Sequence, residues 1–490
     1  MAAVTSKKGP RLMQEFRGVY IEGEFVCTGR KLPCFDPSSG AAWAEVETGG
    51  ADQVDAAVQS ARSAQKQHWG PLAAWQRATV LRKFADILVA NRDEIATVES
   101  RNNGKAVRDT REEVTRGAEW LRFFAGAAST AYGNTFQLEG GTQANVYREP
   151  LGVIGAITPW SSPVYIYMWK LAPALACGNA VVIKPSEIAP ITCGLIAKYA
   201  SEAGLPAGVL NVVTGDATAG AALAAHRGID KLTFTGGVAS GRAVAQLAAG
   251  NFTPTTIEAG GKTALIVLDD ADLDLALGIA VRGSFRSAGQ SCAHISRILV
   301  QRSIYAEFIK KFLPAVRELR VGPALDEQTD VGPVISEASA VRCEGLVKSG
   351  RSSGGNVLLG GQRAKVSEAL GGYYFAPTVL DGVPANSRVM QEEIFGPIAA
   401  IMPFDDDDAA IETANNVDFG LVGALVTRSL SRYRRFVRDL DVGVICVNAF
   451  RPGHWQLPYG GRKRSGMGID NGYDVLRDYT QSKTVMLGAI

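Results

Sequence analysis

The sequence predicts an α/β protein with a parallel, doubly wound sheet. After Arg148, short apolar runs alternate with stretches of helical pattern such as Ile191 to Ala203. Buried strands that alternate with helices are typical of parallel sheets covered on both faces. The apolar runs are Val153–Ile157, Val181–Ile183, Leu210–Val213, Leu232–Phe234 and Leu265–Leu268. A second region, from about residue 262 to 450, has a similar succession of strand-like and helix-like segments.

The segment that precedes these strands, from Gln53 to Val98, is predicted to be helical. Within it, one apolar face at i, i+3, i+4 and i+7 is made by Leu81, Phe84, Ala85 and Leu88. A stripe at this spacing marks an amphipathic helix that packs against a core. Farther along, the four acids Asp405 to Asp408 are expected to form a solvated loop or the start of a helix rather than a metal site.

Composition places the chain among ordinary globular proteins. It has 490 residues, of which 20% are charged and 46% hydrophobic, so a disordered or fibrous chain is excluded. At roughly 100 to 200 residues per domain, this length predicts two to four domains. The net charge of +2 is too balanced to indicate nucleic acid or an anionic membrane as a partner.

The cysteines and the apolar stretches indicate the cellular compartment in which the protein is expected. The seven cysteines are odd in number and include no C-x-x-C pair, which argues against a disulfide framework or a zinc ribbon. The first residues lack the apolar centre of a signal peptide. The longest apolar stretch, Leu171 to Ile183, is shorter than the roughly 20 residues of a membrane helix. We therefore expect a cytoplasmic protein with free thiols and no membrane partner.

Three familiar nucleotide and metal signatures are missing. Gly261-Lys262-Thr263 ends like a phosphate-binding P-loop, but position 256, where that motif needs a glycine, is Thr256. No G-x-G-x-x-G occurs either, so the usual dinucleotide fingerprint is missing. The four histidines have no metal-ligand spacing. No metal site is expected.

A set of short motifs carries the functional signal. They are Ile157-Thr-Pro-Trp160 with Trp169-Lys-Leu-Ala-Pro-Ala-Leu175, Val181-Val-Ile-Lys-Pro-Ser-Glu187, Phe234-Thr-Gly-Gly237 with Gly241, Glu258-Ala-Gly-Gly-Lys262, Gly289-Gln-Ser-Cys292, Glu393-Ile-Phe-Gly-Pro397, and Pro458-Tyr-Gly-Gly461 with Ser465-Gly466. In this order and spacing, from about residue 20 to the end, the chain resembles the NAD(P)-dependent aldehyde dehydrogenase superfamily. The resemblance implies oxidation of a small-molecule aldehyde.

The resemblance assigns the catalytic roles. Cys292 matches the nucleophile: a thiolate attacks an aldehyde, and loss of hydride leaves a thioester that water cleaves. Glu258, before the flexible Gly260-Gly261 turn, resembles the general base that activates this water. Ser161 stands where the family usually has an Asn that stabilises the oxyanion, and losing such a donor typically costs about 10²- to 10³-fold in rate. His294, where a small residue is usual, is left open between assisting the chemistry, crowding the loop and having no role.

The resemblance also implies a nicotinamide cofactor. Lys184 and Glu187 resemble the pair that binds the adenine ribose, and because a carboxylate there would repel a 2′-phosphate, NAD is favoured over NADP. Glycines that open a helix after a strand let backbone N–H groups approach a pyrophosphate. The expected cofactor-binding residues are Ile157, Trp160, Lys184, Glu187, Gly220, Gly236, Gly237, Gly241, Glu393 and Phe395.

The implied aldehyde tunnel is unusually polar. The substrate residues expected there are Trp169, Arg286, Arg451 and Tyr459, together with Ser162, Gly453 and His454. Several of these positions are often aromatic or apolar in the family. Because arginine binds carboxylates as a bidentate pair, we expect a substrate with a carboxylate or other polar tail, held by Arg286 or Arg451. A solvated arginine at the tunnel mouth is the alternative.

The family's three-part arrangement implies the domains. Residues 1–128 and 150–258 would form a Rossmann-like cofactor domain, and 259–458 the α/β catalytic domain, with Cys292 at their junction. Residues 129–149 and 459–490 would form a small β oligomerisation arm and the C-terminal segment. Because a strand-like arm exposes an edge that invites pairing, a homodimer or homotetramer is expected.

Three other functions stay open at this point. A coenzyme A-dependent variant is the nearest, although Glu258 favours hydrolysis. Ser161 and His294 motivate a catalytically weakened NAD-binding scaffold, which would bind NAD tightly without aldehyde turnover. A cysteine esterase would acylate Cys292 and need no cofactor.

Overall fold

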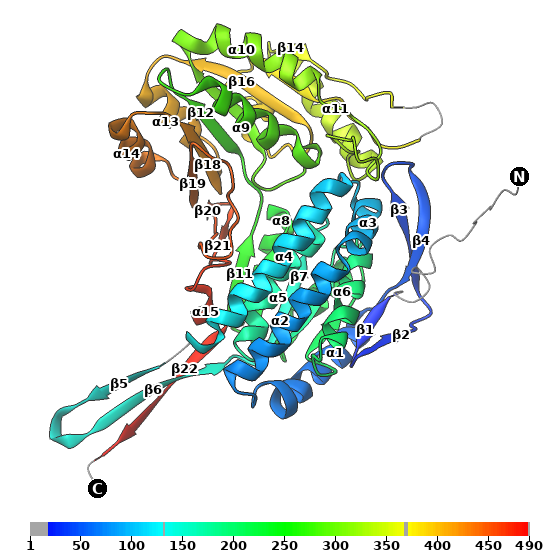
Figure 1. Ribbon diagram of the computed structural model, residues 1–490, viewed down its shortest axis with the longest axis vertical. Coiled ribbons are helices and arrows are strands. Elements are labelled where there is room, and N and C mark those ends of the chain that lie inside the picture. The colour runs from blue at the N-terminus through cyan, green and yellow to red at the C-terminus, as the bar shows by residue number, and fades with distance from the viewer. Residues whose placement is uncertain (1–17, 131–132, 367–370, 489–490) are drawn as a thin grey trace, which may run out of the picture.

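The computed structural model describes residues 18–130, 133–366 and 371–488. The predicted domain ranges that begin at residue 1, end at 490, or contain 131–132 and 367–370 therefore lie partly outside the described residues. The elements form two large α/β units and a slender arm (Figure 1). The α/β fold expected from the sequence is confirmed.

The first unit is an eight-stranded sheet of order β2-β1-β9-β8-β7-β10-β11-β21. Its strands are β1 (Val19–Ile21), β2 (Glu24–Val26), β7 (Val153–Thr158), β8 (Ala180–Pro185), β9 (Leu210–Val212), β10 (Lys231–Thr235), β11 (Thr255–Glu258) and β21 (Gly466–Met467). The five central strands run parallel, as predicted, and antiparallel strands flank them. β21 reaches this sheet from far along the chain, pairing Gly466 with Glu258.

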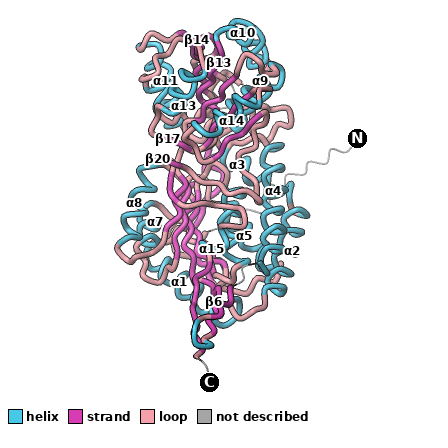
Figure 2. Tube along the Cα trace, turned by 90° about the vertical axis from the view of Figure 1, so that its left-hand side faces the viewer, coloured by secondary structure: helices cyan, strands magenta, loops and turns pink. Residues whose placement is uncertain are grey.

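Helices cover both faces of this sheet (Figure 2). One face carries α1 (Ala51–Ala64), α7 (Ala217–Ala224) and α8 (Val238–Ala249), and the other carries α2 (Ala74–Ala90), α3 (Arg92–Asn103), α4 (Val107–Ala127), α5 (Pro163–Ala176) and α6 (Ile191–Glu202). Side chains alternate across β7, so that Ile154 packs with the α2–α6 side and Val153 with the α1 side. The helices predicted between residues 53 and 98 are confirmed as α1, α2 and α3.

The second unit is a seven-stranded sheet of order β14-β15-β16-β13-β12-β18-β19, parallel except for β14. Its strands are β12 (Thr263–Val267), β13 (Ile295–Gln301), β14 (Asn356–Leu359), β15 (Thr378–Asp381), β16 (Ile398–Phe404), β18 (Val422–Val426) and β19 (Val444–Val447). Around it lie α9 (Leu273–Phe285), α10 (Arg302–Arg317), α11 (Glu337–Ser352), α12 (Arg388–Gln391), α13 (Asp407–Asn415) and α14 (Leu430–Asp439). The Asp406 side chain caps α13, which confirms a helix start at the acidic run.

The arm is a three-stranded antiparallel sheet that projects from the body (Figure 1). β5 (Asn134–Gln137), β6 (Gln143–Pro150) and β22 (Thr480–Leu487) form it, with β6 in the middle. Smaller elements are the pairs β3 (Lys31–Asp36) with β4 (Ala41–Glu47) and β17 (Phe419–Gly420) with β20 (Arg462–Lys463), and the short helix α15 (Val475–Asp478). Among the described residues, no helix is long and apolar enough to cross a membrane.

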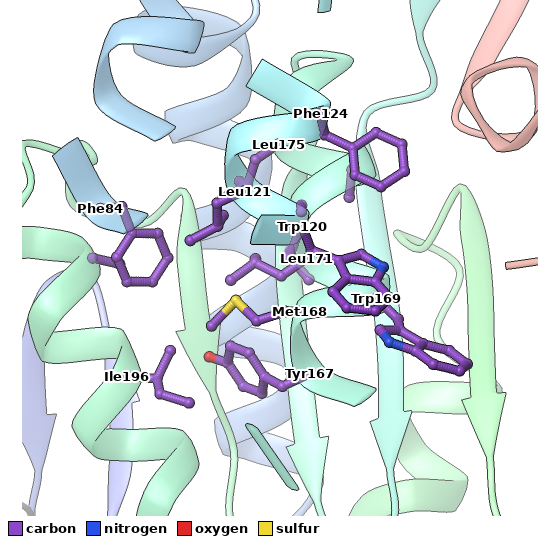
Figure 3. Packing of buried hydrophobic residues seen from close by; sticks show 14 of the residues in the cluster. Phe84, Trp120, Leu121, Phe124, Tyr167, Met168, Trp169, Leu171, Leu175 and Ile196 are labelled. Carbon is purple, nitrogen blue, oxygen red and sulfur yellow. The ribbon is translucent and has the colours of Figure 1, made fainter. Parts of the chain in front are cut away.

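The core between α4 and α5 extends to the site described below. Trp120 on α4 stacks on Trp169 of α5, with ring centroids 5.7 Å apart (Figure 3). Trp169 also meets the Tyr459 ring edge-on at 4.9 Å. Because both tryptophans are almost fully buried, this aromatic column holds one wall of the site rigidly.

Candidate active site

A cavity of about 620 Å³ lies between the two sheets' loops and helices. Side chains from α4, α5 and α9 line it, together with the loops around residues 286–294 and 448–459. Several predicted residues from distant parts of the chain meet there, namely Ser161, Trp169, Arg286, Cys292, Arg451 and Tyr459. Its size suits a small organic ligand.

Cys292 sits on a tightly wound loop just before β13. Ser287 and Ala288 have left-handed backbones, with φ of 55° and 54°, and a side chain on Gly289 would clash with the Gly396 carbonyl. These conformations are costly for ordinary residues and are common at functional sites. Burial raises the pKa of the Cys292 thiol to about 11, with a hydrogen bond from Tyr459 opposing this shift and the carboxylate of Glu258 adding to it.

Glu258 is the last residue of β11, where it is 3% exposed. Neither carboxylate oxygen has a hydrogen-bond partner among the described residues. Burial raises its pKa well above the usual value, the nearby Asp470 carboxylate raises it further, and Lys170 opposes them. A buried, unpartnered carboxylate with a raised pKa is suited to exchange a proton with a reacting group.

A buried ion pair lies beside Glu258 and was not found from the sequence. Lys170 Nζ binds Asp470 Oδ2 at 2.7 Å, and both side chains are essentially inaccessible. The only sequence signal was a lysine inside the apolar stretch of α5, because a buried charge needs a partner. That partner lies 300 residues away, a separation that no local pattern reveals.

Ser161 and His294 line the same cavity. Ser161 is 8% exposed and precedes Ser162, which is the N-cap residue of α5 and accepts a hydrogen bond from Lys105 Nζ at 2.6 Å. Burial lowers the pKa of His294 to about 3, and the Lys262 charge adds to the shift. His294 is therefore neutral near pH 7.

The predicted cofactor residues gather at the carboxyl ends of β7, β8 and β10, where doubly wound sheets bind ligands. Lys184 lies near the end of β8 and pairs with Glu187 at 3.0 Å, while Gly237 opens α8. A Cβ built on Gly237 would meet no atom within 4 Å, and one on Gly220 would only touch Ile157 and Lys184 at 4.0 Å. Gly237 thus leaves open space over the start of α8, which fits a nucleotide diphosphate.

A second group of predicted cofactor residues lies nearer Cys292. Trp160 meets the Phe395 ring edge-on at 5.2 Å, and Phe395 has a left-handed backbone with φ of 54°. Glu393 accepts a hydrogen bond from the Gly261 N–H at 3.2 Å, and burial raises its pKa to about 7. A Cβ on Gly260 would overlap the Glu393 carboxylate, so this glycine is what lets Glu393 approach the Glu258 turn.

The charged residues of the cavity are mostly paired. Arg286, predicted to bind a substrate tail, already binds Asp109 at 3.0 Å and Glu112 at 2.7 Å. Lys105 binds Glu113 at 2.6 Å. Within the described residues, no ion pair includes Arg451 or Arg116.

Arg116 is a cavity residue that sequence reasoning missed. It comes from α4, donates to the Gly453 carbonyl at 2.6 Å and lies over the Tyr165 ring at 5.2 Å from the ring centroid. Arg116 lies in the middle of a long helix and belongs to no sequence motif that would mark it as functional. Only the packing of α4 against the 448–459 loop reveals it.

The fold and this site together describe an α/β protein in which a partly buried cysteine faces a small-molecule cavity, beside a sheet edge of the kind at which doubly wound sheets bind ligands. The model of the aldehyde dehydrogenase family matches residues 25–485. The chain belongs to the aldehyde dehydrogenase family, whose reaction is the oxidation of an aldehyde to the acid.

Solved structures agree with this membership. A betaine aldehyde dehydrogenase from Staphylococcus aureus, in complex with NAD+, matches with a TM-score of 0.93 and 32% identity over 97% of this chain and 95% of that chain. A putative aldehyde dehydrogenase from Burkholderia cenocepacia matches with a TM-score of 0.94 and 36% identity over 97% and 98%. An NADP dependent enzyme from E. coli matches with a TM-score of 0.94 and 34% identity over 97% and 99%.

Proposed function

We propose that the protein oxidises a polar, acid-bearing aldehyde with NAD+, using Cys292 as nucleophile and Glu258 as general base. The observation that carries the proposal is the cavity itself, because Cys292 faces it and the Glu258 carboxylate acts electrostatically on the Cys292 thiol. The complex of NAD+ with the Staphylococcus aureus relative supports the choice of cofactor.

In the proposed reaction, Glu258 or water takes the Cys292 proton, and the sulfur forms a bond to the aldehyde carbon while the carbonyl electron pair moves to oxygen. The backbone N–H of Cys292 and the Ser161 hydroxyl stabilise that oxyanion. NAD+, when bound, would supply the acceptor for the hydride that leaves this carbon, and Cys292 would then carry the acyl group as a thioester. Lys184, Glu187 and Glu393 would hold the cofactor's two riboses.

Release of the acid falls to Glu258. Its carboxylate takes a proton from water, the water oxygen bonds to the thioester carbon, and the carbon–sulfur bond breaks to regenerate Cys292. A buried carboxylate without hydrogen-bond partners among the described residues is free to hold such a water. This hydrolytic role favours water over coenzyme A as the acyl acceptor.

Glu187 supports NAD rather than NADP. Because its carboxylate would repel a 2′-phosphate, we expect Glu187→Ser to raise kcat/KM with NADP by about tenfold while weakening use of NAD. Steady-state rates with each cofactor measure this, with Glu202→Gln on the surface of α6 as the control. An unchanged cofactor ratio in Glu187→Ser would place the adenine ribose elsewhere.

The substrate tail is proposed to be anionic because the cavity has two arginines without carboxylate partners, Arg116 and Arg451. The carboxylates that line it, Glu112, Glu113 and Asp274, are already engaged by Arg286, Lys105 and Lys311 respectively. Betaine aldehyde, for which several structural relatives are named, carries a fixed positive charge. Two unpaired arginines disfavour that cation and favour a carboxylate.

Substituting these arginines tests the tail. We expect Arg116→Gln and Arg451→Gln each to raise KM for an aldehyde that carries a carboxylate by about 10- to 100-fold, since hydrogen bonds to charged groups contribute about 1.5–3 kcal/mol. KM for a neutral aliphatic aldehyde of the same length should stay the same. Arg428→Gln, at a distant exposed ion pair, is the control. A wild-type preference for the neutral aldehyde would refute an anionic tail.

The function as a whole is tested by NADH formation with short, long, aromatic and acid-bearing aldehydes. A second candidate function is an NAD-binding protein with weakened catalysis, because Ser161 replaces the Asn that is usual in the family. If the wild type forms no NADH with any of these aldehydes and Ser161→Asn does, that candidate is favoured. Ester cleavage at full rate without NAD would favour a cysteine esterase.

Assembly and location are also proposed. The arm exposes apolar side chains, including Phe136, Met486 and Leu487, on a sheet with open edges, and such edges favour pairing with another copy in a homodimer or homotetramer. All seven cysteines are free thiols, which fits the reducing cytoplasm.

A further inference from the structure

The hydroxyl of Tyr459 lies against the proposed nucleophile. Tyr459 Oη is 3.5 Å from Cys292 Sγ, within hydrogen-bonding distance for sulfur. Both residues line the same cavity as Ser161. The sequence analysis placed Tyr459 only among the residues of the substrate tunnel.

Tyr459 is held in place from two sides. Its backbone exchanges two hydrogen bonds of 2.7 Å with Asp470, whose side chain forms the buried pair with Lys170. Its ring packs edge-on against Trp169, and the residue is 2% exposed. A hydroxyl fixed in this way acts without the cost of reorganising at the moment of reaction.

Either group can donate in this contact while Cys292 is a thiol, but once Cys292 is a thiolate only the Tyr459 hydroxyl can donate. Burial raises the pKa of Tyr459 well above its usual value, and the negative charges of Cys292 and Glu258 raise it further, so the phenol keeps its proton. The same hydrogen bond lowers the pKa of Cys292, the direction expected when a donor faces a thiolate. No other hydrogen bond of this hydroxyl occurs among the described residues.

Ser161 makes the other side-chain donor of this cavity a short one. Its side chain is shorter than the amide usual in the family, and it reaches the cavity from the start of α5. When sulfur bonds to the aldehyde carbon, the new alkoxide is attached to an atom that is itself bonded to Cys292 Sγ. A donor 3.5 Å from Sγ reaches that oxygen when the alkoxide is oriented toward Tyr459.

We propose that Tyr459 is a catalytic hydrogen-bond donor, which stabilises the Cys292 thiolate before attack and the alkoxide after it. Tyr459 keeps its proton throughout, so the step still consists of forming the sulfur–carbon bond and moving the carbonyl pair to oxygen. The inference rests on the proposed function only in taking Cys292 as the nucleophile.

The first test needs no aldehyde. In Tyr459→Phe the ring and its packing on Trp169 remain, while the donor is lost. The rate of Cys292 alkylation by iodoacetamide is followed over a pH series by mass spectrometry. We expect the pH at which this rate rises to be higher in Tyr459→Phe than in the wild type. Tyr167→Phe is the matched control, since Tyr167 is a buried tyrosine of α5 whose hydroxyl faces the core (Figure 3). An unchanged alkylation profile in Tyr459→Phe overturns the proposal.

The second test combines substitutions at Tyr459 and Ser161 in one protein. We expect Tyr459→Phe to lower kcat by about 10²- to 10³-fold, as for the loss of one oxyanion donor. Ser161→Asn should raise kcat more in the Tyr459→Phe background than in the wild type, because the two donors serve one charge and their effects do not add. Wild-type turnover in Tyr459→Phe, or equal gains in both backgrounds, overturns the proposal. If no aldehyde is turned over by any variant, the proposed function fails while the alkylation profile still decides the role of Tyr459.

Discussion

Cys292→Ala is expected to lower aldehyde-dependent NADH formation by roughly 10⁴- to 10⁶-fold, the scale on which a catalytic nucleophile acts. The reason is that the proposed route passes through two covalent states of one sulfur, and no other cysteine faces the cavity. The remaining six thiols do not line the cavity, and burial raises the pKa of Cys177 and of Cys343 to about 12.

The measurement is steady-state NADH absorbance for wild type and Cys292→Ala, with binding of NAD+ followed separately by fluorescence. Cys27→Ala, at an exposed cysteine, is the matched control and should keep full turnover. NAD+ binding should survive in both variants. Turnover that persists in Cys292→Ala would contradict a cysteine mechanism altogether.

Glu258→Gln is expected to separate the two halves of the reaction. Without a base to activate water, acylation should still release about one NADH per active site, after which turnover slows by about 10²- to 10⁴-fold. Stopped-flow absorbance detects that burst, and mass spectrometry detects the acyl group that stays on Cys292. Glu202→Gln on the surface serves as the control. A fast steady state after the burst would remove Glu258 from the deacylation step.

The same residue predicts a pH dependence. The Glu258 carboxylate accepts a proton only when ionised, and burial raises its pKa well above the ordinary value. Deacylation in the wild type should therefore quicken as pH rises through that raised pKa and slow as pH falls. In Glu258→Gln this rise should disappear from the steady-state rate.

The fold was predictable from local sequence patterns, because each strand or helix shows its buried face in its own run of residues. β7 and β8 were predictable from continuous apolar runs, because strands buried on both faces do not alternate. α2 was predictable from its apolar stripe, because a helix repeats its buried face every 3.6 residues. The acidic run at Asp405 was likewise readable as a helix start. These features depend on neighbours in sequence.

The site was predictable only where a motif marked it. Cys292 and Glu258 stand in short motifs, so their roles could be predicted from the resemblance to the family without a structure. Arg116 and the Lys170–Asp470 pair depend on which helix packs against which loop, and that information is spread over hundreds of residues. The pairing of Arg286 with Asp109 and Glu112 was invisible for the same reason.

The order in which the chain is synthesised gives the late strand β21 a further importance. The ribosome makes Glu258 and Cys292 long before Gly466, which closes the edge of β11 beside Glu258, and before Tyr459. Domains fold as they emerge, from the N-terminal side onward. A growing chain therefore holds its reactive thiol without the groups that complete the site, and chemical competence arrives only near the end of translation.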